Sequence, residues 1–206
     1  PISPEELFQI MTIINLDDPI LFQLASEYSY NLDDSGYVNK VYLSYSMDKN
    51  EYTSKYSKVL DRLQNMYSKI NVSDQDTALT SKKSGTEYNV EQVALSLIRN
   101  LNCLSSNSDS TVADDSLDMF SSTKLFNLYG RYVGLDCAIK IGLPISADED
   151  TLLSHGGYYY DSLSDIDKYT YFNDNKYTVD FDFNNYCCWN IVRIENNWYN
   201  LDISLN

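Results

Sequence analysis

The sequence predicts an α+β fold, in which helices pack on a small antiparallel sheet. Helical and strand patterns occupy separate stretches: in some, apolar residues recur every three or four positions, and in others they alternate with polar residues. The clearest alternation is at the C-terminus, where 187–194 and 198–203 flank a turn at 195–197 and predict a hairpin. At 206 residues, 43% of them hydrophobic, the chain has enough apolar side chains for the core of one domain.

The N-terminal residues predict a helix followed by a hairpin. Ser3 is a suitable N-cap, Pro4 suits the first helical position, and Glu6 completes a capping box. The helix is expected to end at Asp17–Pro19. The hairpin has two strands and a turn between them, expected at 28–32, 37–45 and 33–36.

A second capping signal, Asp48–Glu51, opens a long amphipathic helix. Its apolar row runs from Tyr52 to Ile70 in alternating steps of four and three. Such a row also suits a coiled-coil seam, but over so few turns we interpret it as a face that packs on the core. Residues 71–88 are polar and are predicted to be a linker or loop.

The middle of the chain predicts two more helices and a strand. One helix is expected to be capped near Asn89, followed by a polar loop at 105–115. The next is expected at 121–132, with Gly134 as a left-handed cap at its end. Residues 135–142 alternate and predict a strand.

The C-terminal hairpin carries two short motifs, Trp189–Val192 in its first strand and Trp198–Asp202 in its second. They resemble the transglutaminase-like fold, whose members have a His-Ala-Trp-Asn strand, a turn, and then Trp-Tyr-x-x-Asp. The order of the expected elements is similar to that of bacterial members of this family over roughly 160 residues. The resemblance implies a papain-like core at 86–206 with an insertion at 143–186, preceded by a helix-hairpin-helix segment at 1–75.

The family's triad is a Cys nucleophile on a helix, the His of the first strand and the Asp of the second. By this resemblance Met119 stands in place of the Cys, Cys187 stands in place of the His, and Asp202 is kept, with Trp189 beside them. Acyl transfer needs a thiolate, which an imidazole generates by taking the thiol proton. A thioether has no proton to lose, and a thiol, with a pKa of about 8.5, is a poor base near neutral pH. The resemblance therefore implies a catalytically inactive member with vestigial triad positions.

An enzyme with a rearranged site in the same cleft is the alternative. Ser121 and Ser122 lie beside the nucleophile position, and Cys187 could pair with His155, the one histidine of the chain. A site of this kind would catalyse acyl transfer or peptide hydrolysis.

The insertion is rich in tyrosine and contains an expected hairpin, with strands at 168–172 and 176–183 around a turn at 173–175. Flat, amphipathic tyrosine rings suit a sugar or peptide surface, but they are also ordinary strand residues. Both interpretations stay open. The candidate binding residues are His155, Tyr158, Tyr159, Tyr160, Tyr169 and Tyr171.

Composition narrows the classes of partner. The formal net charge of −15 opposes binding to the phosphate backbone of a nucleic acid. No apolar run approaches the length of about 20 residues that a membrane span needs. Cys103, Cys137, Cys187 and Cys188 have no zinc-site spacing, so neither a metal nor a cofactor is expected.

The sequence thus predicts a module that binds a protein, peptide or glycan. Family habit and the acidic composition suggest a secreted or cell-surface bacterial protein, and hence an extracellular location. The resemblance supplies the fold and the vestigial site, and the tyrosines of the insertion supply the candidate binding surface.

Overall fold

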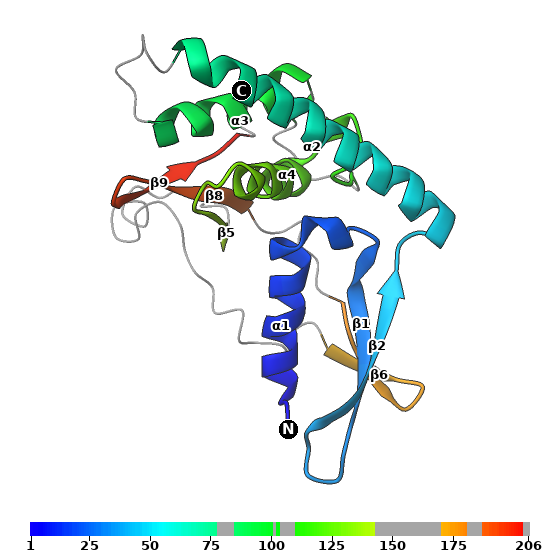
Figure 1. Cartoon of the computed structure of the whole chain (residues 1–206). Helices are drawn as coiled ribbons and strands as arrows, with labels where there is room; N and C mark the ends of the chain where they lie inside the picture. Colours follow the sequence, from blue (N-terminus) through cyan, green and yellow to red (C-terminus); the bar gives the residue numbers. More distant parts are fainter. Residues whose placement is uncertain (78–84, 101, 104–109, 143–169, 181–186, 204–206) are drawn as a thin grey trace, which may run out of the picture. The chain divides into compact units, whose positions relative to one another are not determined.

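The computed structural model describes residues 1–77, 85–100, 102–103, 110–142, 170–180 and 187–203 (Figure 1). It confirms a mixed α+β fold with antiparallel sheets. The chain forms two compact units. The first comprises Pro1–Asp48 and Ile141–Cys187, and the second comprises Lys49–Lys140 and Cys188–Asn206.

The first unit begins with helix α1 (Pro4–Asp17), whose predicted capping box is confirmed. The backbone N–H of Glu6 donates to Ser3 Oγ at 3.1 Å, and the backbone N–H of Ser3 donates to Glu6 Oε2 at 2.8 Å. The helix ends as predicted, because the Asp18 carboxylate accepts from the N–H of Ile20 and opens the 3₁₀ turn η1 (Pro19–Leu21). Phe8 and Met11 bury the apolar face of α1.

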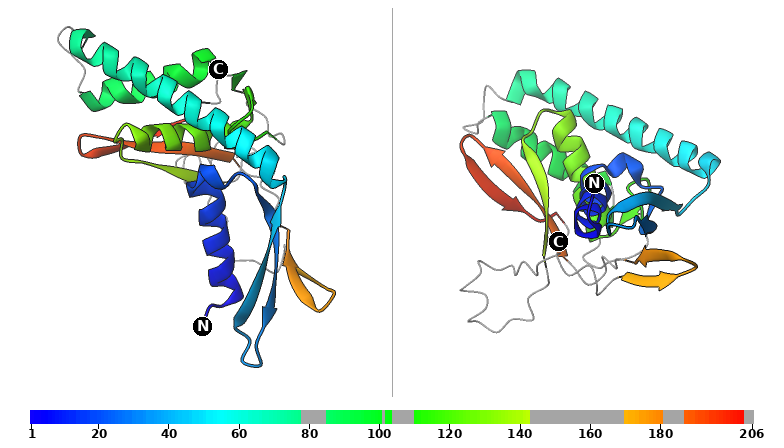
Figure 2. Two further views of the ribbon diagram at one scale, coloured as in Figure 1. Left: turned by 45° about the vertical axis from the view of Figure 1, so that its right-hand side comes forward. Right: turned by 90° about the horizontal axis from the view of Figure 1, so that it is seen from below.

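A four-stranded antiparallel sheet completes this unit (Figure 2). Its strand order is β2-β1-β7-β6. The strands are β1 (Leu24–Leu32), β2 (Val38–Tyr45), β6 (Thr170–Asn173) and β7 (Lys176–Val179).

The first predicted hairpin of this sheet is confirmed, and the second is confirmed in its described residues, except that Asn173 belongs to β6 and not to the turn and that β7 ends before Asp180. Asp174 and Asn175 have φ values of 49° and 60°, which is the backbone of a two-residue hairpin turn with positive φ at both positions. The sequence did not predict that β7 pairs with β1, placing Tyr30 opposite Tyr177. Local patterns carry no information about pairing between segments so far apart in the chain.

The second unit begins with two packed helices, α2 (Lys49–Thr77) and α3 (Gly85–Asn100). The predicted linker at 71–88 is wrong at both ends, because α2 continues to Thr77 and α3 starts at Gly85. Residues 71–77 are polar but contain neither Gly nor Pro, so nothing in their backbone stops the helix.

Helix α4 (Met119–Tyr132) packs on α3 and starts two residues before its predicted position. The cause is Asp118, an N-cap whose Oδ1 accepts from the N–H of Ser121 at 2.6 Å. Gly134 ends the helix with φ 81°, as predicted. Leu125 and Phe126 are completely buried along α4.

The second sheet has three strands in the order β5-β8-β9: β5 (Cys137–Gly142), β8 (Cys187–Ile194) and β9 (Asn197–Leu201). The predicted C-terminal hairpin is confirmed, with Ile194 opposite Asn197 and Glu195-Asn196 as its turn. The turn residue with positive φ is Glu195, at 57°. A short parallel pair, β3 (Asn102–Cys103) with β4 (Ser116–Leu117), precedes α4.

The division into units differs from the expected domain boundaries. The helix-hairpin-helix segment at 1–75 was expected to be separate, but α2 groups with α3 and α4 rather than with the N-terminal hairpin. Much of the expected insertion at 143–186 lies outside the described residues. Its described hairpin, β6–β7, belongs to the sheet of the first unit.

Helix α4 approaches β5 closely at Gly130. A Cβ added at Gly130 would lie 2.9 Å from Cys137 Sγ, which is buried and cannot move aside freely. We expect Gly130→Ala to lower the free energy of unfolding by about 1–3 kcal/mol in urea denaturation, although Ala is the better helix former. In a Cys137→Ala background the same change should cost much less. A Gly130→Ala variant more stable than the parent chain would contradict this contact.

Candidate functional site

The start of α4 is bound to β8 by hydrogen bonds inside the core of the second unit (Figure 1). The Cys188 thiol donates to the Met119 carbonyl oxygen, with 3.6 Å between sulfur and oxygen. The Thr123 hydroxyl donates to the Cys188 carbonyl at 3.4 Å, and the Asn190 amide donates to the Thr123 carbonyl at 3.0 Å. Met119, Thr123, Cys188 and Asn190 are all buried, so the first two turns of α4 are fixed on the strand.

Two of the positions that the resemblance assigns to the triad lie at the ends of elements in this unit. Met119 is the first residue of α4 and is 7% exposed. Asp202 follows β9 and is half-buried, and its charge acts on the Cys188 thiol. Trp189 is buried in β8, where its indole N–H donates to Asn200 Oδ1 on β9 at 3.0 Å.

Cys187, the position assigned to the missing histidine, is the first residue of β8 and is partly exposed. Its neighbour Cys188 is buried and contacts the first turn of α4. Sequence reasoning did not single out Cys188. The alternation of β8 shows that the two thiols point to opposite faces, but not which face meets the helix.

The environment of Cys188 opposes ionisation of its thiol. The pKa of Cys188 is raised to about 12, mainly by burial and with smaller contributions from the charges of Asp118 and Asp202, while the Thr123 hydroxyl and Lys124 act in the opposite direction. Desolvation also lowers the pKa of Lys124. The charged ammonium group is therefore less favoured, and its stabilisation of a Cys188 thiolate is weaker. The thiol is therefore neutral at physiological pH and is not activated as a nucleophile.

The serines beside the helix start are engaged with the backbone. Ser121 Oγ donates to the Ser110 carbonyl oxygen at 2.7 Å, and Ser122 Oγ donates to the Met119 carbonyl oxygen at 3.0 Å. Both residues are buried. The one histidine, His155, lies outside the described residues, so the proposed partner of a rearranged site is not placed.

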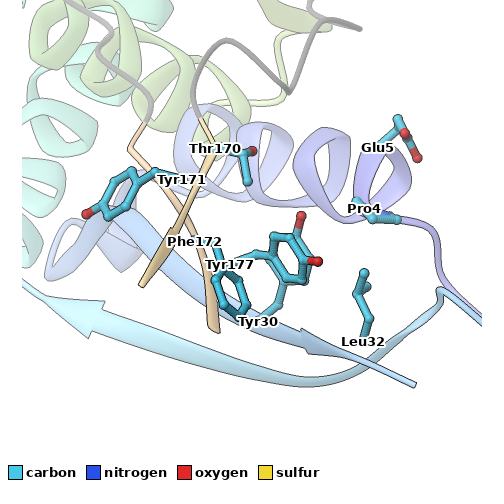
Figure 3. Close-up of a pocket in the computed structure, with 8 residues that line it drawn as sticks. All are labelled: Pro4, Glu5, Tyr30, Leu32, Thr170, Tyr171, Phe172 and Tyr177. Atoms are coloured by element: carbon cyan, nitrogen blue, oxygen red, sulfur yellow. The ribbon is translucent and has the colours of Figure 1, made fainter. Parts of the chain in front are cut away.

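Most of the tyrosine candidates, namely Tyr158, Tyr159, Tyr160 and Tyr169, also lie outside the described residues. Tyr171 is described on β6 and is 48% exposed. It borders a hollow of about 380 Å³ within the first unit (Figure 3). The hollow is lined by Pro4, Glu5, Tyr30, Leu32, Thr170, Tyr171, Phe172 and Tyr177. Sequence reasoning missed Tyr30 and Phe172, because their place beside Tyr177 follows from the unpredicted pairing of β1 with β7.

The described residues bear on two kinds of partner, a metal ion and a membrane. Within the described ranges, no group of three or more His, Cys, Asp or Glu side chains is arranged to hold a metal ion. Among the described helices, none combines the length and the apolar character that crossing a membrane requires.

The burial of Cys188 predicts a contrast between adjacent thiols. In the native chain, iodoacetamide should modify Cys188 at least about tenfold more slowly than Cys187, because alkylation requires an exposed thiolate. Peptide mapping after timed quenching measures both rates in one sample, and the urea-unfolded chain is the control in which they should converge. Faster labelling of Cys188 than of Cys187 in the native chain would contradict the buried environment.

The same environment predicts a loss of stability at alkaline pH. The unfolded thiol ionises near its ordinary pKa of 9.0, whereas the folded thiol resists ionisation up to about 12. The stabilisation is therefore complete below about pH 9 and is lost as pH rises towards the folded pKa, by at most about 1.4 kcal/mol per pH unit. We expect the free energy of unfolding to fall more steeply between about pH 9 and pH 10, below the ordinary range of tyrosine, in the parent chain than in Cys188→Ser. The Cys187→Ser variant should keep the parent slope, and equal slopes in the parent and Cys188→Ser would refute the assignment.

Comparisons with known proteins do not assign the chain to a family: no protein-family model matches it, and no curated protein matches it. The interpretation of the site therefore depends on its own residues and geometry.

Proposed function

We propose that the second unit is a transglutaminase-like core that has lost its catalytic groups, and that the chain serves as a binding module. Its partner would be a protein, a peptide or a glycan, and the parent would be a secreted or cell-surface bacterial protein. The observation that carries the proposal is the start of α4, where a thioether and a buried, neutral thiol occupy the space beside the helix N-terminus.

The arrangement of the elements supports the fold part of the proposal. In the family that the sequence resembles, a helix start faces a strand bearing the Trp-Asn motif, and an Asp follows the next strand. Here α4 begins at Met119 and is bonded to Asn190 of β8, and Asp202 follows β9. The charge of Asp202 reaches the Cys188 thiol, so the helix start and the acidic residue share one electrostatic environment.

The chemistry of these groups supports the loss of catalysis. The Met119 thioether cannot form a thiolate, and burial keeps Cys188 protonated. A helix N-terminus favours a thiolate, but the Asp118 carboxylate caps this one and adds a negative charge beside it. In an active relative, the Asp at the position of Asp202 would orient an imidazole. Neither Cys187 nor Cys188 can replace that imidazole as the base.

The alternative of a rearranged Cys/His or Ser site has one feature in its favour, the partial exposure of Cys187. The described serines do not support it, because the hydroxyls of Ser121 and Ser122 donate to backbone carbonyls. A serine nucleophile would instead need its proton directed at a base.

We expect the 206-residue chain to show no amine incorporation into glutamine peptides and no peptide hydrolysis above the buffer blank. A fluorescent amine donor with a glutamine acyl donor, and a quenched peptide library, measure the two reactions. The Cys187→Ala and Asp202→Ala variants should also give signals equal to the buffer blank in both assays. Turnover by the parent chain that disappears in either variant would overturn the proposal and favour the rearranged enzyme.

A further inference from the structure

The hollow in the first unit lies where the N-terminal turn of α1 meets the face of the four-stranded sheet (Figure 3). Its walls come from three parts of the chain: the first turn of α1, strand β1, and the β6–β7 hairpin. All of these belong to one compact unit. The volume of about 380 Å³ is near the lower end of the range for small-molecule sites, so it suits a ligand of one or two rings.

Three aromatic side chains form a ladder across the floor of the hollow. Tyr30 of β1 is paired with Tyr177 of β7, which is paired with Phe172 of β6. The Tyr30 and Tyr177 rings are stacked with centroids 5.4 Å apart, and the Phe172 ring is tilted against Tyr177 at 5.0 Å. Exposure rises from 3% at Tyr30 to 62% at Phe172, so the ladder has a buried base and an open aromatic end.

The polar groups of the hollow lie beyond the ring edges. Figure 3 shows the hydroxyls of Tyr30 and Tyr177 on the side of their rings that faces Glu5 and Leu32, while Tyr171 points away from the cluster. Glu5 is exposed, and the capping box uses Glu6, so the Glu5 carboxylate is not needed to cap α1. Among the described residues that line the hollow there is no Lys or Arg side chain.

We propose that this hollow binds a neutral sugar, as a single residue or a disaccharide. The C–H groups on the flat face of a pyranose suit the negative face of the exposed Phe172 ring. Sugar hydroxyls suit the Tyr177 hydroxyl and the Glu5 carboxylate, which accepts strong charge-assisted hydrogen bonds. The inference gives the proposed binding role a site and a ligand class, and to that extent it rests on the proposed function.

Other ligand classes fit the lining less well. Phosphate and sulfate groups would meet the Glu5 carboxylate and, in the described part of the lining, no cation, on a chain of net charge −15. A wholly apolar ligand would remove water from the Tyr177 hydroxyl and the Glu5 carboxylate without replacing the hydrogen bonds of that water. An organic cation binds best over open ring faces. Of the three rings in the ladder only Phe172 is exposed, because Tyr30 and Tyr177 are stacked on each other, so the hollow lacks the cage of several ring faces that holds an organic cation most tightly.

The test is a titration of the ¹⁵N-labelled 206-residue chain with cellobiose, lactose and N,N′-diacetylchitobiose, followed by two-dimensional NMR. We expect at least one disaccharide to give saturable shifts at Tyr30, Phe172 and Tyr177. Phe172→Ala, at an exposed position, should weaken that binding by about tenfold or more. Tyr177→Phe, which keeps the ring and its stacking, should weaken it by at least about threefold through loss of the hydroxyl. Tyr45→Ala, which removes an equally exposed ring outside the hollow, should bind as the parent does.

The outcomes separate this inference from the proposed function. If no disaccharide gives saturable shifts at tens of millimolar, or if Phe172→Ala and Tyr177→Phe bind normally, the sugar site is refuted. Tighter binding of tetramethylammonium than of every sugar, lost in Glu5→Gln, would replace it with a cation site. Sugar binding by a chain that also turns over acyl donors would overturn the inactive-core proposal and leave the sugar site standing.

Discussion

The second unit depends on hydrogen bonds between buried polar groups of α4 and β8 in its core. Asn190 is fully buried, its amide donates to the Thr123 carbonyl, and the Thr123 hydroxyl donates to the Cys188 carbonyl. A buried polar group that loses its partner costs about 1–3 kcal/mol. Moving α4 along β8 by one residue would break both bonds, so these hydrogen bonds fix the register of helix against strand in a way that apolar contacts alone would not.

The same contacts explain why the helix start is unsuited to thiol chemistry. Fixing α4 on β8 buries the Cys188 thiol, which contacts the first turn of the helix, and burial favours its neutral form. An active thiol site needs the reverse: solvent access, a nearby base and a net positive field. At this position the N-cap carboxylate of Asp118 and the charge of Asp202 both oppose a thiolate. The packing that stabilises the unit therefore also makes the Cys188 thiol unreactive.

The features that the sequence predicted depend on residues close together in the chain, and most of those that it missed depend on residues far apart. The capping box of Ser3 and Glu6, the left-handed cap at Gly134 and the turn at Asp174-Asn175 each depend on a few neighbouring residues, and the sequence identified all three. The end of α2 was misplaced because polar residues without Gly or Pro are compatible with both loop and helix. The pairing of β1 with β7 and the burial of Cys188 depend on residues distant in the chain, on which local periodicity is silent.

The pairing of β1 with β7 changes how the tyrosines of the expected insertion are interpreted. Considered alone, it is an insertion into a core, and its tyrosines could equally be ordinary strand residues. In the structure Tyr177 stacks on Tyr30, and the hollow exists only because the β6–β7 hairpin extends a sheet begun by the N-terminal hairpin. Tyr30 is nearly inaccessible, Phe172 is open, and Tyr177 connects them, so neither segment alone would present this surface. The N-terminal segment and the β6–β7 hairpin therefore together make the surface that we propose as a binding site, and its chemistry is independent of whether the other unit retains a reacting group.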